Sequence, residues 1–318
     1  MSKSMTKISA VMLAVMTFLS SIFVVPANAA TGDKVTISFN YCYDTNGNLI
    51  KYQQTTVNDG YTVGSAGDEL LITYVDGREV YCIQPGHALY AGDQLTEGSS
   101  SAWNSLGTAK QNTINLALLC GKPGSGSSLP GNSDEKWAAT QLIVWEIVSG
   151  CRETSGSYNC TNTKYINGIT AGGANSGVRS AYNQIVSNMQ TMKKIPSFAA
   201  DSTGSAKTYE MNASGSSYTL TLTDSNSVLG KFDFKSNGGV TVSKSGNKLT
   251  LTAKSPITSA VTLSASKSVS GASASLIAYG DSGLQDVVSG ASGITVNVLC
   301  IPFQTTADRA DHPIIRTA

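Results

Sequence analysis

The pattern of apolar and polar positions changes near residue 196 and divides the chain into two regions. Before this point, alternation typical of strands is mixed with the spacing typical of amphipathic helices. From about Ala200 to Cys300, short alternating runs are separated by turns rich in Asn, Gly and Ser. We therefore predict an α+β fold, with a mixed N-terminal domain followed by an all-β, sandwich-like domain that is immunoglobulin-like.

Strands are predicted at two places in the first region. Residues 34–43 alternate apolar and polar positions, as in a half-buried strand. Residues 68–75 and 78–84 flank the dipeptide Asp76-Gly77, which suits a type I′ hairpin turn because both central positions need positive φ. Counting outward from the turn places Cys82 opposite Leu71. Pro85 ends the second strand, so Cys82 is expected where the sheet gives way to a loop.

Three helices are predicted after this hairpin. The first covers residues 108–120, and a Gly-, Ser- and Pro-rich loop covers residues 121–131. The second begins at an N-cap supplied by Asn132 or Ser133 and ends at Gly150. The third runs from about residue 177 to 194. Helical spacing places one apolar face on the second helix, made by Trp137, Gln141, Val144, Trp145 and Val148.

The first 29 residues have the features of an export signal. Lys3 and Lys7 precede a mostly apolar stretch from Ile8 to Val25, and a small-residue cleavage site ends at Ala29. A membrane-spanning helix is the alternative, but the stretch is short for a bilayer and ends in a cleavage pattern. We expect a mature protein that is secreted or displayed on the cell surface, without insertion into the membrane.

Charge and composition restrict the classes of function. Removing Lys3 and Lys7 from the 22 basic residues leaves 20, against 21 acidic residues, so the mature chain has a formal charge of −1. This balance gives no electrostatic reason to expect a nucleic-acid or anionic-membrane partner. Abundant Gly, Ser and Thr are typical of a β-rich surface protein. No pattern for a cofactor or a metal site is present.

The residues that carry chemistry are Cys82 and Gln141, because a thiol and a carboxamide can condense to a thioester with loss of ammonia. Considered alone, Gln141 is also compatible with a buried structural glutamine that is hydrogen-bonded to a neighbouring segment. Cys82 is also compatible with a small buried apolar residue, half of a disulfide, or a nucleophile paired with His87. The spacing alone leaves these alternatives open.

The two motifs together resemble those of thioester domains, also called TQXA domains, of Gram-positive surface adhesins. The first is the aromatic-Cys-aliphatic motif Tyr81-Cys82-Ile83, and the second is Thr140-Gln141 followed by Leu142-Ile143-Val144-Trp145. The resemblance covers about residues 34–196 and follows an export signal. It implies β-structure with a helical insertion and a Cys82–Gln141 thioester.

The resemblance also implies the function and the surroundings of the bond. The thioester would covalently capture an amine, such as that of lysine, on a host cell-surface or extracellular-matrix protein, in a single event without catalytic turnover. Tyr81, Thr140, Trp137 and Trp145 are expected to border it. A noncovalent secreted binding module with structural cysteines is the alternative function, and a cysteine hydrolase is a more distant one.

Four further expectations concern the residues that compete for Cys82, the other cysteines and the organisation of the chain. Gln84 competes with Gln141 for Cys82, but residues i and i+2 of a strand stand roughly 6–7 Å apart. Cys151 and Cys160 close a short loop and are predicted to form a disulfide, whereas the pairing of Cys42, Cys120 and Cys300 stays open and Cys120 could compete for Cys82. The predicted organisation is a signal peptide over 1–29, a thioester domain over 30–198, a β-sandwich over 199–302, and an unpatterned tail over 303–318. No sorting motif or C-terminal anchor is present, so the chain is a truncated adhesin, is shed into the medium, or assembles with an anchored partner. The abrupt loss of pattern after Thr306 favours truncation.

Overall fold

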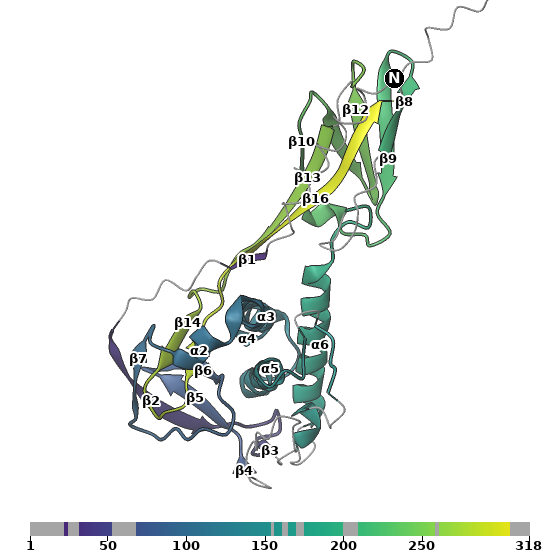
Figure 1. Cartoon of the computed structure of the whole chain (residues 1–318). Helices are drawn as coiled ribbons and strands as arrows, with labels where there is room; N and C mark the ends of the chain where they lie inside the picture. Colours follow the sequence, from purple (N-terminus) through teal and green to yellow (C-terminus); the bar gives the residue numbers. More distant parts are fainter. Residues whose placement is uncertain are drawn as a thin grey trace, which may run out of the picture. The chain divides into compact units, whose positions relative to one another are not determined.

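A computed structural model describes most of the chain, which folds into two compact units (Figure 1). The first unit in the sequence consists mainly of residues 24–193, and residues 269–294 return to it. The second consists of the described residues within 194–268 and 295–305, together with Ile22 and Phe23. The described residues are 22–24, 32–52, 68–153, 156–160, 165–169, 175–199, 209–257 and 261–305.

A closed barrel of six strands forms one half of the first unit. The strand order is β14-β15-β6-β5-β2-β7. The pairing of β15 with β6 is part of the closed ring of strands, and Val80 of β6 and Val287 of β15 pack in the apolar core of the barrel. The strands are β2 (Lys34–Tyr41), β5 (Leu71–Val75), β6 (Arg78–Cys82), β7 (Gln94–Glu97), β14 (Ile277–Gly280) and β15 (Val287–Ser289); β3 (Lys51–Tyr52) and β4 (Asp68–Glu69) form a separate pair.

The predicted hairpin is present and forms β5 and β6. Asp76 and Gly77 have φ values of 46° and 78°, as a type I′ turn requires. The ladder pairs Val75 with Arg78 and Thr73 with Val80. This register would continue to Leu71 and Cys82, but the ladder between the two strands ends at Thr73 and Val80. Cys82 therefore has main-chain groups at the end of β6 that need another partner.

Helices pack beside the barrel in the same unit (Figure 1). Residues 107–120 and 175–193 form helices close to the predicted ranges, while part of the predicted loop 121–131 is helical because Pro123 starts a short turn. Gly121 allows close packing, since a Cβ at this position would lie 2.7 Å from the Thr140 side chain. The helices are α2 (Ser101–Ser105), α3 (Gly107–Cys120), α4 (Lys122–Ser125), α5 (Ser133–Val148) and α6 (Asn175–Lys193), with short 3₁₀ turns η1 (Gly126–Ser128) and η2 (Tyr165–Gly168).

The helix α5 carries Gln141 and is buried on nearly all sides. Asn132 is its N-cap, and it forms a capping box with Glu135, whose carboxylate accepts from the Asn132 N–H at 2.7 Å. The sequence predicted a single apolar face, but residues 137–147 are all buried. The reason is that α5 contacts α3, α6 and the strands β5 and β6, so every side of the helix has a neighbour.

The second unit is a curled sheet around its own apolar core. Its strand order is β10-β13-β16-β8-β9-β12-β11, and the two end strands contact one another. Leu222, Phe232 and Leu263 lie in the core. The strands are β8 (Tyr209–Ser214), β9 (Ser217–Thr223), β10 (Asp233–Ser236), β11 (Thr241–Ser245), β12 (Lys248–Ala253), β13 (Val261–Val269) and β16 (Ile294–Thr305), with β1 (Ile22–Val24) paired to β16 and η3 (Leu229–Lys231) between β9 and β10.

The division of the chain differs from the predicted boundaries. The pattern of short alternating strands predicts one uninterrupted domain over residues 199–302, whereas β14 and β15 belong to the barrel of the first unit. Short alternating strands have the same pattern in both units, so the pattern does not reveal the return. The α+β class agrees with the structure, and the immunoglobulin-like sandwich stays a prediction. Most of the predicted signal peptide and residues 306–318 of the predicted tail lie outside the described residues, while residues 303–305 belong to β16.

Candidate functional site

The Gln141 carboxamide binds the main chain of Cys82 through both of its polar atoms. Oε1 of Gln141 accepts a hydrogen bond from the Cys82 N–H at 2.8 Å, and Nε2 donates to the Cys82 carbonyl at 3.0 Å. A strand residue would bond both groups of Cys82 in this way in an antiparallel ladder. The Gln141 side chain thus replaces the strand residue that would have bonded Cys82 if the β5–β6 ladder had continued. The structure brings Cys82 and Gln141 together, although they are 59 residues apart.

Burial removes this contact from bulk water. Cys82 is 5% exposed and Gln141 is 1% exposed. Burial raises the pKa of the Cys82 thiol to about 12, because a thiolate is poorly solvated there. The Trp145 side chain and the Gln84 main chain oppose this rise. The Cys82 thiol is therefore protonated at neutral pH, and the main chain of the same residue contacts the desolvated Gln141 carboxamide.

Two aromatic clusters lie on either side of Gln141 along α5. Tyr81 stacks on Trp137 with ring centroids 5.8 Å apart, and the Trp137 N–H donates to the Val80 carbonyl at 3.2 Å. Thr140 belongs to this side, where its hydroxyl accepts from the Lys122 N–H at 3.1 Å. Three of the four residues predicted to border the thioester, Tyr81, Trp137 and Thr140, thus lie together on the N-terminal side of Gln141 along α5.

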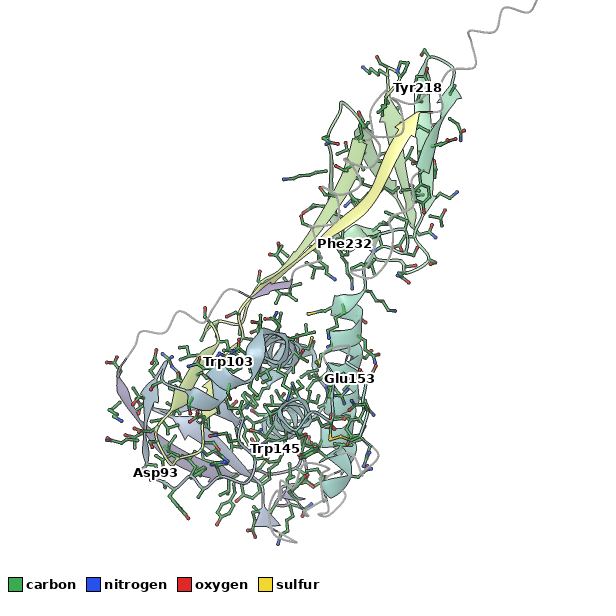
Figure 2. All side chains as sticks on the ribbon, in the orientation of Figure 1. Asp93, Trp103, Trp145, Glu153, Tyr218 and Phe232 are labelled. Carbon is green, nitrogen blue, oxygen red and sulfur yellow. A yellow bond between two sulfur atoms is a disulfide. The ribbon has the colours of Figure 1, made fainter. Side chains whose placement is uncertain are left out.

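Trp145 forms the second cluster, one turn after Gln141. Its ring lies 5.7 Å from the Tyr52 ring in an edge-on arrangement and 6.2 Å from the Tyr165 ring. Figure 2 labels Trp145 among the side chains around α5. The two clusters cover both ends of the Cys82–Gln141 contact.

The Tyr81 hydroxyl gives a prediction for this site. It is fully buried and completes no hydrogen bond of good geometry among the described residues. Burial raises the pKa of Tyr81, and the nearby Thr140 hydroxyl opposes this rise. Replacing Tyr81 by Phe removes a polar group that has no partner, so we expect the free energy of unfolding to change by less than about 1 kcal/mol. Urea unfolding of Tyr81→Phe tests this. A loss of 2 kcal/mol or more, on the order of a broken buried hydrogen bond, would contradict it.

The competitors of Gln141 and Cys82 are engaged elsewhere. The Gln84 side chain accepts from the Asp286 N–H at 2.7 Å, and its carbonyl accepts from the Gln285 side chain at 3.0 Å. Cys120 contacts the sulfur of Met192 at 3.5 Å and is a free buried thiol, as is Cys42. The side chain of Cys300 lies outside the described side chains. His87 is exposed, and no hydrogen bond joins it to the buried Cys82 in the described part of the chain.

Asp286 is a buried carboxylate beside the site that sequence reasoning missed. Its Oδ2 accepts from the Ser100 hydroxyl at 2.7 Å and from the Ala102 N–H at 2.9 Å, at the start of α2. Its main-chain carbonyl accepts from the Ile83 N–H at 3.1 Å. Asp286 therefore ties α2 to the segment that follows Cys82. The sequence pattern does not indicate this role, because Asp286 lies within residues 269–294, which return to the first unit.

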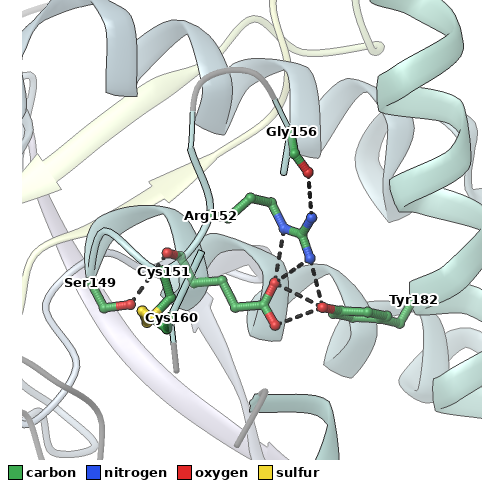
Figure 3. Close-up of polar contacts among 7 residues, drawn as sticks. Ser149, Cys151, Arg152, Gly156, Cys160 and Tyr182 are labelled. Atoms are coloured by element: carbon green, nitrogen blue, oxygen red, sulfur yellow. Dashed lines mark hydrogen bonds and ion pairs between the residues drawn. A yellow bond between two sulfur atoms is a disulfide. The ribbon is translucent and has the colours of Figure 1, made fainter. Parts of the chain in front are cut away.

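A buried ion pair and a disulfide fix the end of α5. Arg152 donates through Nε and Nη2 to one oxygen of Glu146, at 2.9 and 2.6 Å, and through Nη1 to the Gly156 carbonyl at 2.7 Å (Figure 3). The Tyr182 hydroxyl donates to the second Glu146 oxygen at 2.6 Å. The predicted Cys151–Cys160 disulfide is present next to Arg152. The one sequence feature that indicates this ion pair is Glu146 within an apolar helix, because a buried carboxylate needs a nearby cation.

Two further findings concern ligands and membranes. Within the described ranges, no group of three or more His, Cys, Asp or Glu side chains is arranged to hold a metal ion. No helix in this part of the chain is long and apolar enough to cross a membrane.

Comparisons with known proteins give matches among solved structures alone. No protein-family model and no curated protein matches the sequence. The thioester domain of the Staphylococcus aureus TIE protein matches with a TM-score of 0.46 and 15% identity over 86% of this chain and 99% of that chain. The thioester domain of the Enterococcus faecium TIE86 protein matches with a TM-score of 0.34 and 14% identity over 85% and 96%. The Bacillus anthracis TIE protein gives 0.36 and 14% over 85% and 49%. Each TM-score lies below 0.5, so these similarities alone assign no function.

Proposed function

We propose that Cys82 and Gln141 condense to an internal thioester, and that the protein is a secreted or surface-displayed adhesin that captures an amine covalently. The observation that supports this proposal is the pair of hydrogen bonds between the Gln141 carboxamide and the Cys82 main chain. They hold the carboxamide carbon beside the residue that carries the thiol. Such positioning replaces a slow bimolecular encounter by an intramolecular reaction.

The hydrogen bonds also favour the chemistry of condensation. The Cys82 N–H donates to Oε1, where negative charge develops when Sγ attacks Cδ. The tetrahedral intermediate then loses Nε2, and the thiol proton leaves with it, so one ammonia is released and one C–S bond is formed. Nε2 already donates to the Cys82 carbonyl, which orients this leaving group. Burial protects the product from hydrolysis.

In the capture of the partner, the acyl group of Gln141 passes from the Cys82 sulfur to an amine nitrogen of the partner. An amine nitrogen attacks Cδ of Gln141, the C–S bond breaks, and Cys82 leaves as a thiolate that takes up the proton released by the nitrogen. The product is an amide between Gln141 and the partner. Because the thioester is consumed, each chain reacts once, and the protein is not a catalyst with turnover. The proposed partner is a lysine amine on a host cell-surface or extracellular-matrix protein.

Intact mass measurement of the mature protein tests the thioester. We expect a mass lower than the sequence mass by one ammonia, beyond the loss from the disulfide, and an increase by one methylamine after incubation with that amine. Cys82→Ala should abolish both changes, because no thiol remains to form the bond. Cys120→Ala, which removes another buried thiol, should retain both.

The opposite result would support the noncovalent binding module. In that case, the wild-type chain has the full sequence mass apart from its disulfide, and methylamine adds nothing. The hydrogen bonds of Gln141 would then be structural, since they satisfy the end of β6 without any chemistry.

A further inference from the structure

The two tryptophans that flank Gln141 on α5 differ in what their N–H groups do. The Trp137 N–H donates to the Val80 carbonyl at 3.2 Å. The Trp145 N–H is buried and completes no hydrogen bond within the described residues. An unpaired buried donor lowers the free energy of unfolding by about 1–3 kcal/mol. Its presence in a folded protein therefore calls for a reason, which a functional role would supply. A candidate acceptor must lie within the same pocket.

The Cys82 sulfur is the candidate acceptor for the Trp145 N–H. Trp145 follows Gln141 by four residues, so both side chains leave α5 on the same side, and Gln141 is fixed to Cys82 by two hydrogen bonds. The indole lies close enough to the sulfur to oppose the effect of burial on thiol titration. The Trp145 ring is 8% exposed and is held between Tyr52 and Tyr165, so its orientation is set by packing.

The charge on sulfur decides how strong this contact is. A neutral thiol is a weak acceptor, which agrees with a buried N–H that completes no hydrogen bond. A thiolate carries a full negative charge, and hydrogen bonds to ionised acceptors are shorter and roughly twice as strong. The contact is therefore weak before the reaction and strong when charge collects on sulfur, which is the property required of a group that lowers a barrier.

We infer that the Trp145 N–H is a catalytic donor to the Cys82 sulfur during acyl transfer, a role that rests on the proposed thioester. When the amine nitrogen attacks Cδ of Gln141 and the C–S bond breaks, the bonding electron pair stays on Sγ. The Trp145 N–H stabilises this charge until the proton released by the nitrogen reaches the sulfur. The Gln84 main chain acts on the same sulfur and is a second source of stabilisation.

The rate of aminolysis tests this inference. Chains that carry the thioester are incubated with methylamine, and the first-order loss of the thioester mass is followed over time. Trp145→Phe keeps an aromatic ring but removes the N–H, and we expect the rate to fall roughly 10- to 100-fold, as for a hydrogen bond to a charged group. Trp103→Phe makes the same change on α2, outside the site, and should react within about 3-fold of the wild type, a difference of under 1 kcal/mol.

A second readout separates this role from a structural one. After methylamine has reacted, Cys82 is a free thiol, and its alkylation rate can be followed against pH by mass mapping of its peptide. Trp145→Phe should raise the pKa of this thiol, because the N–H stabilises the thiolate. If the variant does not fold, replacing the indole by a benzothienyl side chain, with sulfur in place of the N–H, makes the same test with little change of shape.

The outcomes are distinguishable. A wild-type chain without the ammonia deficit overturns both the proposed function and this inference. A deficit in the wild type, together with aminolysis of the Trp145 variants at the wild-type rate or an unchanged thiol pKa, overturns this inference alone.

Discussion

Replacing Gln141 by leucine should abolish the ammonia deficit and all capture of methylamine, and it should also destabilise the fold. In a Cys82→Ala background the carboxamide stays intact, so Gln141→Leu there isolates the stability effect. The main-chain N–H and C=O of residue 82 then lose their partners. Each unsatisfied buried group costs about 1–3 kcal/mol, so we expect a loss of about 2–6 kcal/mol in urea unfolding.

The control for this prediction is Gln111→Leu. The Gln111 side chain donates to the Trp103 carbonyl at 2.8 Å from a half-buried position, and its loss should cost about 1 kcal/mol and leave amine capture unchanged. An ammonia deficit that persists in Gln141→Leu would show that another carboxamide supplies the acyl group. Gln84 would then be the first to replace.

Replacing Arg152 by methionine should lower the free energy of unfolding by about 3–5 kcal/mol, because it leaves the Glu146 carboxylate buried without its cation. Adding Glu146→Gln should recover part of this loss, since the double variant no longer carries a buried charge. The stability loss of Arg152→Met should be smaller at acidic pH, where protonation removes the uncompensated buried charge of Glu146. Urea unfolding at mildly acidic and at neutral pH measures both effects.

An exposed ion pair is the control for Arg152. Lys34→Met removes the pair between Lys34 and Asp281, whose side chains are 52% and 34% exposed, and should change stability by less than about 1 kcal/mol. If Arg152→Met were as mild as Lys34→Met, the buried pair would contribute no more than a surface contact. A double variant less stable than Arg152→Met would also contradict the argument from unpaired charge.

The parts of the site that follow local rules could be predicted from the sequence. Asp76-Gly77 defines the hairpin and its register, and Asn132 with Glu135 defines the start of α5. These features depend on turn and cap chemistry within a few residues, so they are visible without knowledge of the fold. They were sufficient to place Cys82 at the end of a strand and Gln141 inside a helix.

The parts that depend on distant segments could not be predicted. The role of Gln141 as a hydrogen-bonding partner of β6 requires knowing that α5 crosses the point where the ladder ends. Asp286 and the pairing of β15 with β6 come from residues that follow most of the second unit in sequence. The full burial of α5 has the same origin, because a sequence pattern shows the apolar positions of a helix but not the number of its neighbours.

The return of β14 and β15 to the barrel also sets an order of events during synthesis. A chain emerges from its N-terminus, so Cys82 and Gln141 are both made long before Val287, the residue that pairs with Cys82. Until β15 arrives, the barrel is open on the side of β6 and the thiol lacks its complete surroundings. Contacts between such distant segments form slowly, because the intervening chain must first be brought together. The complete surroundings of Cys82 and Gln141 are thus assembled only after residues 269–294 have been made.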